Sequence, residues 1–191
     1  MNATLETPVE WAGLNHLALI TNDMDLTVRF WHGVLDAQLV ATIGNEYFRH
    51  YFFDVGSSTV AFFEYRGRNV ETLAKPAGVF DARAGHFDHL SLNLPSHDSL
   101  AELRERLRAA DCGVTSFVDH GLMESIYFND PNGIALEASY WLANPTDQPP
   151  QHDNTALFGD PDPVGAVAEI AAGALVDLPT TSLVNEPTVI A

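Results

Sequence analysis

The feature that most constrains the fold is an internal repeat at an offset of 73 residues. The stretch LNHLALI at 14–20 falls on FDHLSLN at 87–93 when His16 is placed on His89. Both stretches alternate or cluster apolar residues as a partly buried strand does. A repeat of this length indicates two copies of one supersecondary unit, packed as a pair.

Each copy has the pattern of a βαβββ unit. After the strand that carries the histidine, 23–35 and 97–109 place apolar residues three and four apart, which predicts amphipathic helices. Two strands around a turn follow in each copy, at 48–65 and 124–140. The second of these turns is DPNG, in which proline fixes φ and glycine supplies positive φ. We therefore expect an α+β fold with two tandem βαβββ modules, at 12–66 and 85–141.

The remaining residues differ in composition. We expect residues 1–141 to form the paired modules and 142–191 to form a C-terminal extension that is partly helical or irregular. The extension begins with a proline-containing connector, ANPTDQPPQHDN, and the apolar pattern of 163–175 favours a helix. Such an extension can lie across its own domain or across a partner subunit.

Charge and cysteine content narrow the function classes. The formal net charge is −17, which argues against nucleic acid and anionic membranes as partners, because both require clustered Lys and Arg. A small-molecule substrate is the expected partner. Cys112 is the only cysteine, residues 1–11 lack the pattern of a signal peptide, and no apolar run reaches the length of a membrane span. These features predict a protein of the reducing cytoplasm.

Two histidines and two glutamates are the candidate metal ligands. Side chains alternate across a strand, so His16 and His89 face away from the leucines that suit packing against a helix. The offset of 73 also carries Glu64 onto Glu137, and each glutamate lies among apolar residues, where a carboxylate is costly unless it is paired or bound to a cation. Imidazoles and carboxylates that converge predict a divalent transition-metal site.

The paired modules, together with HLAL, FWHGVL, HLSL and SIYFNDPNGIALE, resemble the vicinal oxygen chelate superfamily. This superfamily includes glyoxalase I, bleomycin-resistance proteins, fosfomycin-resistance enzymes and type I extradiol dioxygenases, and the resemblance covers about 12–141. It implies a cupped mixed sheet around a metal held by His16, His89 and Glu137, with Glu64 as the fourth ligand of glyoxalase I-like members. It also implies that the metal binds adjacent substrate oxygens, and that the protein is a homodimer.

Three functions are compatible with this resemblance. The first is an extradiol-type ring-cleaving dioxygenase acting on a catechol-like aromatic. Fe(II) is the favoured metal, with Ni(II), Zn(II) or Mn(II) as alternatives, and Tyr127 and His120 match catalytic positions of the small extradiol enzymes, although the spacing of His120 is two residues shorter. A further extradiol histidine, expected before His89, has no match. The second function is a glyoxalase I-like lyase or isomerase that stabilises an enediolate, which Glu64 favours. The third is a metal-free binding or resistance protein.

Overall fold

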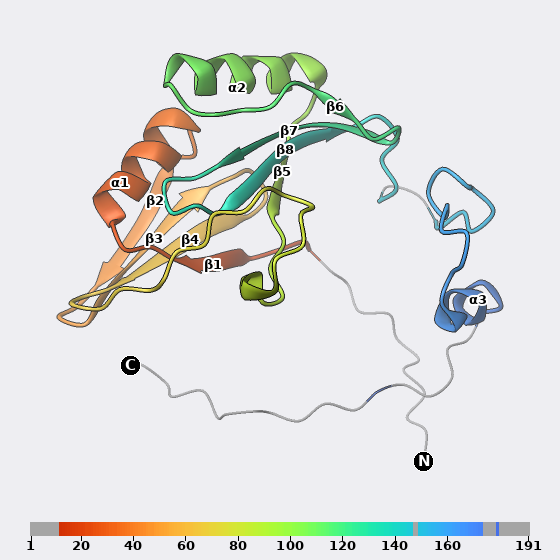
Figure 1. Ribbon diagram of the computed structural model, residues 1–191, viewed down its shortest axis with the longest axis horizontal. Coiled ribbons are helices and arrows are strands. Elements are labelled where there is room, and N and C mark those ends of the chain that lie inside the picture. The colour runs from red at the N-terminus through yellow and green to blue at the C-terminus, as the bar shows by residue number, and fades with distance from the viewer. Residues whose placement is uncertain (1–11, 147–148, 174–178, 180–191) are drawn as a thin grey trace. The chain divides into compact units, whose positions relative to one another are not determined.

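The computed structural model describes residues 12–146, 149–173 and 179. The chain divides into two compact units, Met1–Ala143 and Asn144–Ala191. The first unit holds both modules, and each module contributes its own four-stranded mixed sheet (Figure 1). The expected α+β fold of tandem βαβββ modules is confirmed.

Module 1 has the strand order β1-β4-β3-β2, with β1 parallel to β4 and the other pairs antiparallel. Its elements are β1 (His16–Ile20), α1 (Met24–Val28), the π-helical turn η1 (Arg29–Val34), β2 (Leu39–Gly44), β3 (Phe48–Asp54) and β4 (Thr59–Tyr65). Asp23 caps α1 by accepting a hydrogen bond from the Leu26 backbone N–H. The expected single helix over 23–35 is therefore an α-helical turn that continues into a π-helical one.

Module 2 repeats this order as β5-β8-β7-β6, with β5 parallel to β8. Its elements are β5 (Leu90–Asn93), α2 (His97–Ala109), β6 (Val118–Asp119), β7 (Met123–Asn129) and β8 (Ala135–Trp141). Ser96 caps α2 through the Ser99 N–H, and the helix packs on β7 and β8. The loop between the modules contains one short 3₁₀ turn, η2 (Ala82–Ala84).

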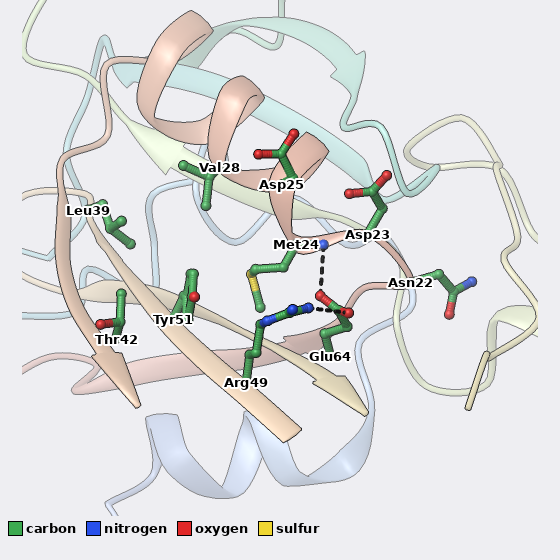
Figure 2. A pocket seen from close by; sticks show the side chains of 10 residues that line it. All are labelled: Asn22, Asp23, Met24, Asp25, Val28, Leu39, Thr42, Arg49, Tyr51 and Glu64. Carbon is green, nitrogen blue, oxygen red and sulfur yellow. Dashed lines mark hydrogen bonds and ion pairs between the residues drawn. The ribbon is translucent and has the colours of Figure 1, made fainter. Parts of the chain in front are cut away.

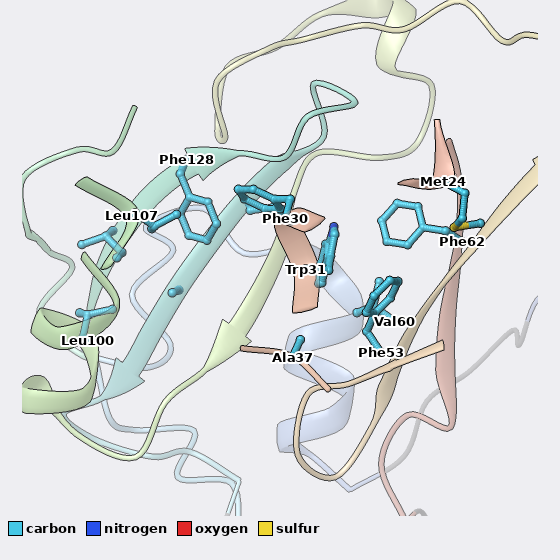
Figure 3. Close-up of a cluster of buried hydrophobic side chains, with 13 residues drawn as sticks. Met24, Phe30, Trp31, Ala37, Phe53, Val60, Phe62, Leu100, Leu107 and Phe128 are labelled. Atoms are coloured by element: carbon cyan, nitrogen blue, oxygen red, sulfur yellow. The ribbon is translucent and has the colours of Figure 1, made fainter. Parts of the chain in front are cut away.

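The core joins the helix of module 1 to the hairpin of module 2. Trp31 is fully buried against Phe53 and Phe62, and its indole Nε1 donates to Asp130 Oδ2 at 3.4 Å. Figure 3 shows Phe30 on the side of this cluster that faces Phe128. Burial of aromatic side chains of this size contributes a large share of the stability of a core. Phe62 is fully buried and belongs to this core.

Polar contacts also hold the two modules together. Thr21 Oγ1 donates to Asn132 Oδ1 at 2.6 Å, and Arg106 donates to the Val34 carbonyl at 2.6 Å. β1 pairs with β4 and β5 pairs with β8, and among the described strands neither β1 nor β5 has a second partner. The modules of one chain thus meet through helices and hairpin, and each sheet ends in an open edge strand.

The second unit contains one described helix, α3 (Gly165–Ala171), which falls inside the expected helical segment. Most of the tail beyond this helix lies outside the described residues. In the part of the chain that the structure covers, every helix is too short or too polar to cross a membrane.

Candidate metal centre

His89 and Glu137 form the centre of the site. His89 lies directly before β5, and Glu137 lies in the neighbouring parallel strand β8. The Nε2 atom of His89 is 3.0 Å from Oε2 of Glu137, and the glutamate side chain is only 5% exposed. The structure therefore brings together the two ligand candidates of module 2.

The residue before His89 orients its ring. Nδ1 of His89 is 2.5 Å from Oδ1 of Asp88. A carboxylate accepts and does not donate, so the proton of this bond belongs to Nδ1. With Nδ1 as the donor to Asp88, Nε2 faces the carboxylate of Glu137 at 3.0 Å, and these two atoms require a proton or a cation between them. The donor set thus fits a divalent metal ion.

Tyr127 and His120 complete a hydrogen-bonded chain that ends at Glu137. The Tyr127 hydroxyl donates to Glu137 Oε1 at 3.1 Å, and His120 Nε2 lies 2.7 Å from the same hydroxyl. Because the single hydroxyl proton points to the carboxylate, Nε2–H of His120 is the donor of the second bond. Burial, followed by the charge of Glu137, raises the pKa of Tyr127. The structure brings both candidate catalytic residues to one candidate ligand.

The surroundings of Glu137 favour its ionised form. Burial raises the pKa of the carboxyl, but the hydroxyls of Ser125, Ser91 and Tyr127 and the nearby His89 together lower it below its ordinary value. The Ser125 hydroxyl is itself fully buried and has no hydrogen-bond partner among the described residues, which leaves it free to respond to a charge at the carboxylate. Glu137 is therefore a buried carboxylate whose surroundings favour the charged form that a cation would bind.

His16 lies in a different environment. Its ring is exposed on β1, Nδ1 is 2.7 Å from Asn15 Oδ1, and its ring neighbours are His50 at 6.4 Å and Phe52 at 5.7 Å between centroids. In residues 12–146, 149–173 and 179, no three His, Cys, Asp or Glu side chains of one chain lie close enough to hold a metal ion. The expectation that four ligands converge within one chain is therefore not met.

Glu64 faces the other side of its sheet. Its carboxylate binds the Arg49 guanidinium at 2.6 Å and accepts from the Met24 backbone N–H at 3.1 Å (Figure 2). These groups line a cavity of about 610 Å³ between α1 and strands β2 and β3. Arg49 and the first turn of α1 satisfy this carboxylate, so the arrangement differs from the expected fourth ligand.

A difference in strand register explains the position of Glu64. In module 2, Glu137 of β8 pairs with the residue two positions after His89. In module 1, the residue two positions after His16 pairs instead with Ala61 of β4. Glu64 is three residues beyond Ala61, and an odd displacement along a strand reverses the face on which a side chain lies. Equal spacing in sequence thus conceals unequal placement in space.

The residues that anchor the two imidazoles were missed in the sequence. Asn15 and Asp88 precede His16 and His89 at the same repeat offset, and both bind Nδ1 of the following ring. Side chains adjacent in a strand normally point to opposite faces, so strand alternation alone argued against such contacts. The recurrence of an Asx residue before each histidine was the available signal.

Comparisons with known proteins agree with this arrangement of modules. The family model described as Glyoxalase/Bleomycin resistance protein/Dioxygenase superfamily matches residues 13–138. A crystal structure of a glyoxylase/bleomycin resistance protein/dioxygenase domain from Frankia sp. EAN1pec is 23% identical, with a TM-score of 0.59, over 69% of this chain and 99% of that one. No curated protein sequence matches the chain.

Two further solved structures are similar at lower identity. Fosfomycin resistance protein FosX from Mesorhizobium loti is 22% identical, with a TM-score of 0.50, over 68% of this chain and 91% of that one. Lactoylglutathione lyase from Agrobacterium tumefaciens is 15% identical, also with a TM-score of 0.50, over 69% of this chain and 95% of that one. At such identities the similarity indicates a shared fold and leaves the reaction open.

Proposed function

Because this chain belongs to the glyoxalase/bleomycin resistance protein/dioxygenase superfamily, we propose that it is a metal-dependent dioxygenase of the extradiol type that cleaves a catechol-like aromatic ring. The observation that carries this proposal is the Glu137 carboxylate, which contacts His89 through one oxygen and Tyr127 through the other. His89 and Glu137 supply candidate metal ligands, and Tyr127 and His120 supply acid–base groups directly beside them.

His89 and Glu137 of one chain, with His16 from a second chain, would hold the metal. Two imidazoles and one carboxylate suit Fe(II), our favoured metal, and also accept Ni(II), Zn(II) or Mn(II). When bound, such a cation supplies Lewis acidity to adjacent oxygens of the substrate and keeps coordination positions open to them. The lowered pKa of Glu137 keeps its carboxylate ionised for this role.

Tyr127 and His120 supply the proton chemistry. The Tyr127 hydroxyl lies within hydrogen-bond distance of both Glu137 and His120. It can donate to a substrate oxygen held at the same place, and its raised pKa keeps it protonated near neutral pH. If Tyr127 gives its proton to the substrate, His120 can pass its Nε2 proton to the tyrosinate and take up a proton from solvent at Nδ1, because the ring is exposed.

A homodimer would complete the ligand set. His16 lies on an open edge strand, and the residues two positions before the histidines, Leu14 and Phe87, are 66% and 36% exposed. Large apolar side chains beside open strands are typical of a surface that another chain covers. We infer that His16 of the partner subunit approaches the pair formed by His89 and Glu137.

Mixed dimers test this shared site. H16A and E137A proteins should each lose tight metal binding. In a two-fold dimer, a mixture of the two variants, unfolded and refolded together, contains dimers with one intact site and should regain roughly a quarter of the wild-type metal content. No recovery on mixing, with dimers present by light scattering, would show that ligands are not shared between subunits.

The reaction itself is tested by metal analysis and oxygen uptake. Protein purified without air should contain iron and should consume O₂ with catechol or 4-methylcatechol, while Y127F should retain iron and lose most of the turnover. Nickel or zinc without oxygen uptake would instead support a lyase or isomerase. That alternative relied on Glu64 as a fourth ligand, and its ion pair with Arg49 weakens the argument. Protein that takes up no metal would be a binding or resistance protein.

A further inference from the structure

Asp88 is the contact between the ligand His89 and the loop that joins the modules. Its Oδ1 accepts from the Gly78 backbone N–H at 2.8 Å as well as from Nδ1 of His89 at 2.5 Å. Its Oδ2 accepts from Lys75 Nζ at 3.0 Å. Three donors from two separate segments thus fix one carboxylate, although half of that side chain is exposed.

Lys75 is unusual because it is buried. Only 7% of the side chain is exposed, and Nζ binds Asp88 and the carbonyl of Pro76. Removing an ammonium group from water is costly unless an opposite charge compensates it. A solvated lysine would need no such partner, so the burial of Lys75 indicates that the ion pair orders the loop against the carboxylate.

The same loop is held from its other side by the hairpin that leads into β8. Asn129 Nδ2 lies 3.5 Å from the Lys75 carbonyl, and Gly133, at φ +83°, packs against Ala74 so closely that an added Cβ would lie 3.0 Å from the Ala74 Cβ. Strand β8 then carries Glu137. The segment 74–78 therefore contacts both Asp88, which holds His89, and the hairpin that leads to Glu137.

Module 1 is built differently at the corresponding place. His16 is anchored by Asn15, a neutral amide, and among the described residues that side-chain amide hydrogen-bonds to the His16 ring alone. A charged acceptor makes the imidazole a stronger donor to a metal than a neutral one does, and substitution of such supporting groups typically weakens metal binding by about 10- to 100-fold.

We propose that Lys75 and Asp88 are positioning residues that lock the His89 ring with Nε2 toward Glu137, so that module 2 binds the metal first and His16 of the partner subunit joins it. This inference rests on the proposed metal function. Neither residue touches the substrate or the metal. Both act through the orientation and basicity of His89.

Metal affinity is the first test. Dissociation constants for Co(II), measured by chelator competition on the full-length chain, should rise about 10- to 100-fold in D88A, by less than about 10-fold in D88N, and by an intermediate factor in K75M. Asn at position 88 keeps the acceptor but not the charge, as in module 1. R29M, which removes the exposed pair between Arg29 and Asp25, is the matched control and should bind as wild type does. Wild-type affinity in both D88A and K75M would overturn the proposal.

The protonation of the His89 ring is a second test that needs no metal. In metal-free protein, ¹⁵N NMR should find Nδ1 of His89 protonated in wild type and D88N, and exchange between the two tautomers in D88A. Thermal unfolding of each variant separates loss of fold from loss of orientation. If wild type binds no Co(II), the proposed function fails while the tautomer still decides the role of Asp88. An unchanged tautomer in folded D88A would refute that role.

Discussion

The two modules carry the same pattern in sequence and different surfaces in space. On the face that bears the histidine, module 2 gathers His89, Glu137 and Tyr127, joined by hydrogen bonds. The same face of module 1 is largely aromatic: His50 stacks on Phe63 at 3.6 Å between ring centroids, and the ring neighbours of His16 are His50 and Phe52. The pair of modules is therefore unequal, with hydrogen-bonded polar candidate ligands concentrated in one half and an apolar wall in the other.

The largest expected effect separates the two glutamates. E137Q should weaken metal binding more than about 100-fold, beyond the range for a supporting residue, because it removes a ligand. E64Q should leave the metal affinity unchanged, since Glu64 is paired with Arg49 on the opposite face. Metal content after dialysis against a chelator measures both. Equal losses in the two variants would mean that the modules contribute alike.

The hairpin turns give a second contrast. G133A forces a Cβ against Ala74 at positive φ and should cost about 2–4 kcal/mol of unfolding free energy. G56A, in the corresponding turn of module 1, also places alanine at positive φ, but the added Cβ meets open space, so it should cost about 1–2 kcal/mol. Urea denaturation of the metal-free protein compares them. A larger loss of unfolding free energy in G56A than in G133A would contradict this prediction.

The pH dependence of stability offers a smaller effect. The pKa of Glu137 is lowered in the folded protein, so its ionised form adds stability above the unfolded pKa of about 4.5, and this contribution is lost as pH falls through the folded value. Metal-free E137Q should therefore lose less stability than wild type between pH 6 and about pH 3. Urea midpoints across this range provide the measurement, and parallel curves would contradict the expected ionisation.

The smallest effect comes from making module 1 resemble module 2. N15D places a carboxylate behind His16 and should tighten Co(II) binding by about two- to fivefold, because a charged acceptor increases the basicity of the ring. The gain is small, since within the described residues the Asn15 side chain contacts the His16 ring and no lysine, whereas Lys75 orders Asp88. Weaker binding in N15D would indicate that the ring of His16 must turn during metal binding.

The fold was accessible from sequence because its determinants are local and repeated. The apolar spacing that becomes α2 and the DPNG turn each act over a few residues. Of the site, the convergence of His89 and Glu137 followed from strand alternation and the 73-residue repeat, whereas the place of Tyr127 followed from the resemblance to the extradiol enzymes. The position of Glu64 could not be predicted, because it depends on the register of β4 against β1, and residue spacing along the chain does not determine that register. The separation of His16 from His89 depends on which surfaces the modules pack together.

The register of β4 against β1 has a consequence for how duplicated proteins diverge. A shift by an odd number of residues moves every side chain of a strand to the reverse side while leaving the hydrogen-bond ladder intact. One inserted or deleted residue in the turn before β4 is therefore enough to move a carboxylate from the face that bears the histidine to the face that packs against the helix. Loss of a coordinating group in one copy of a repeat can thus occur with the glutamate itself still present in the gene.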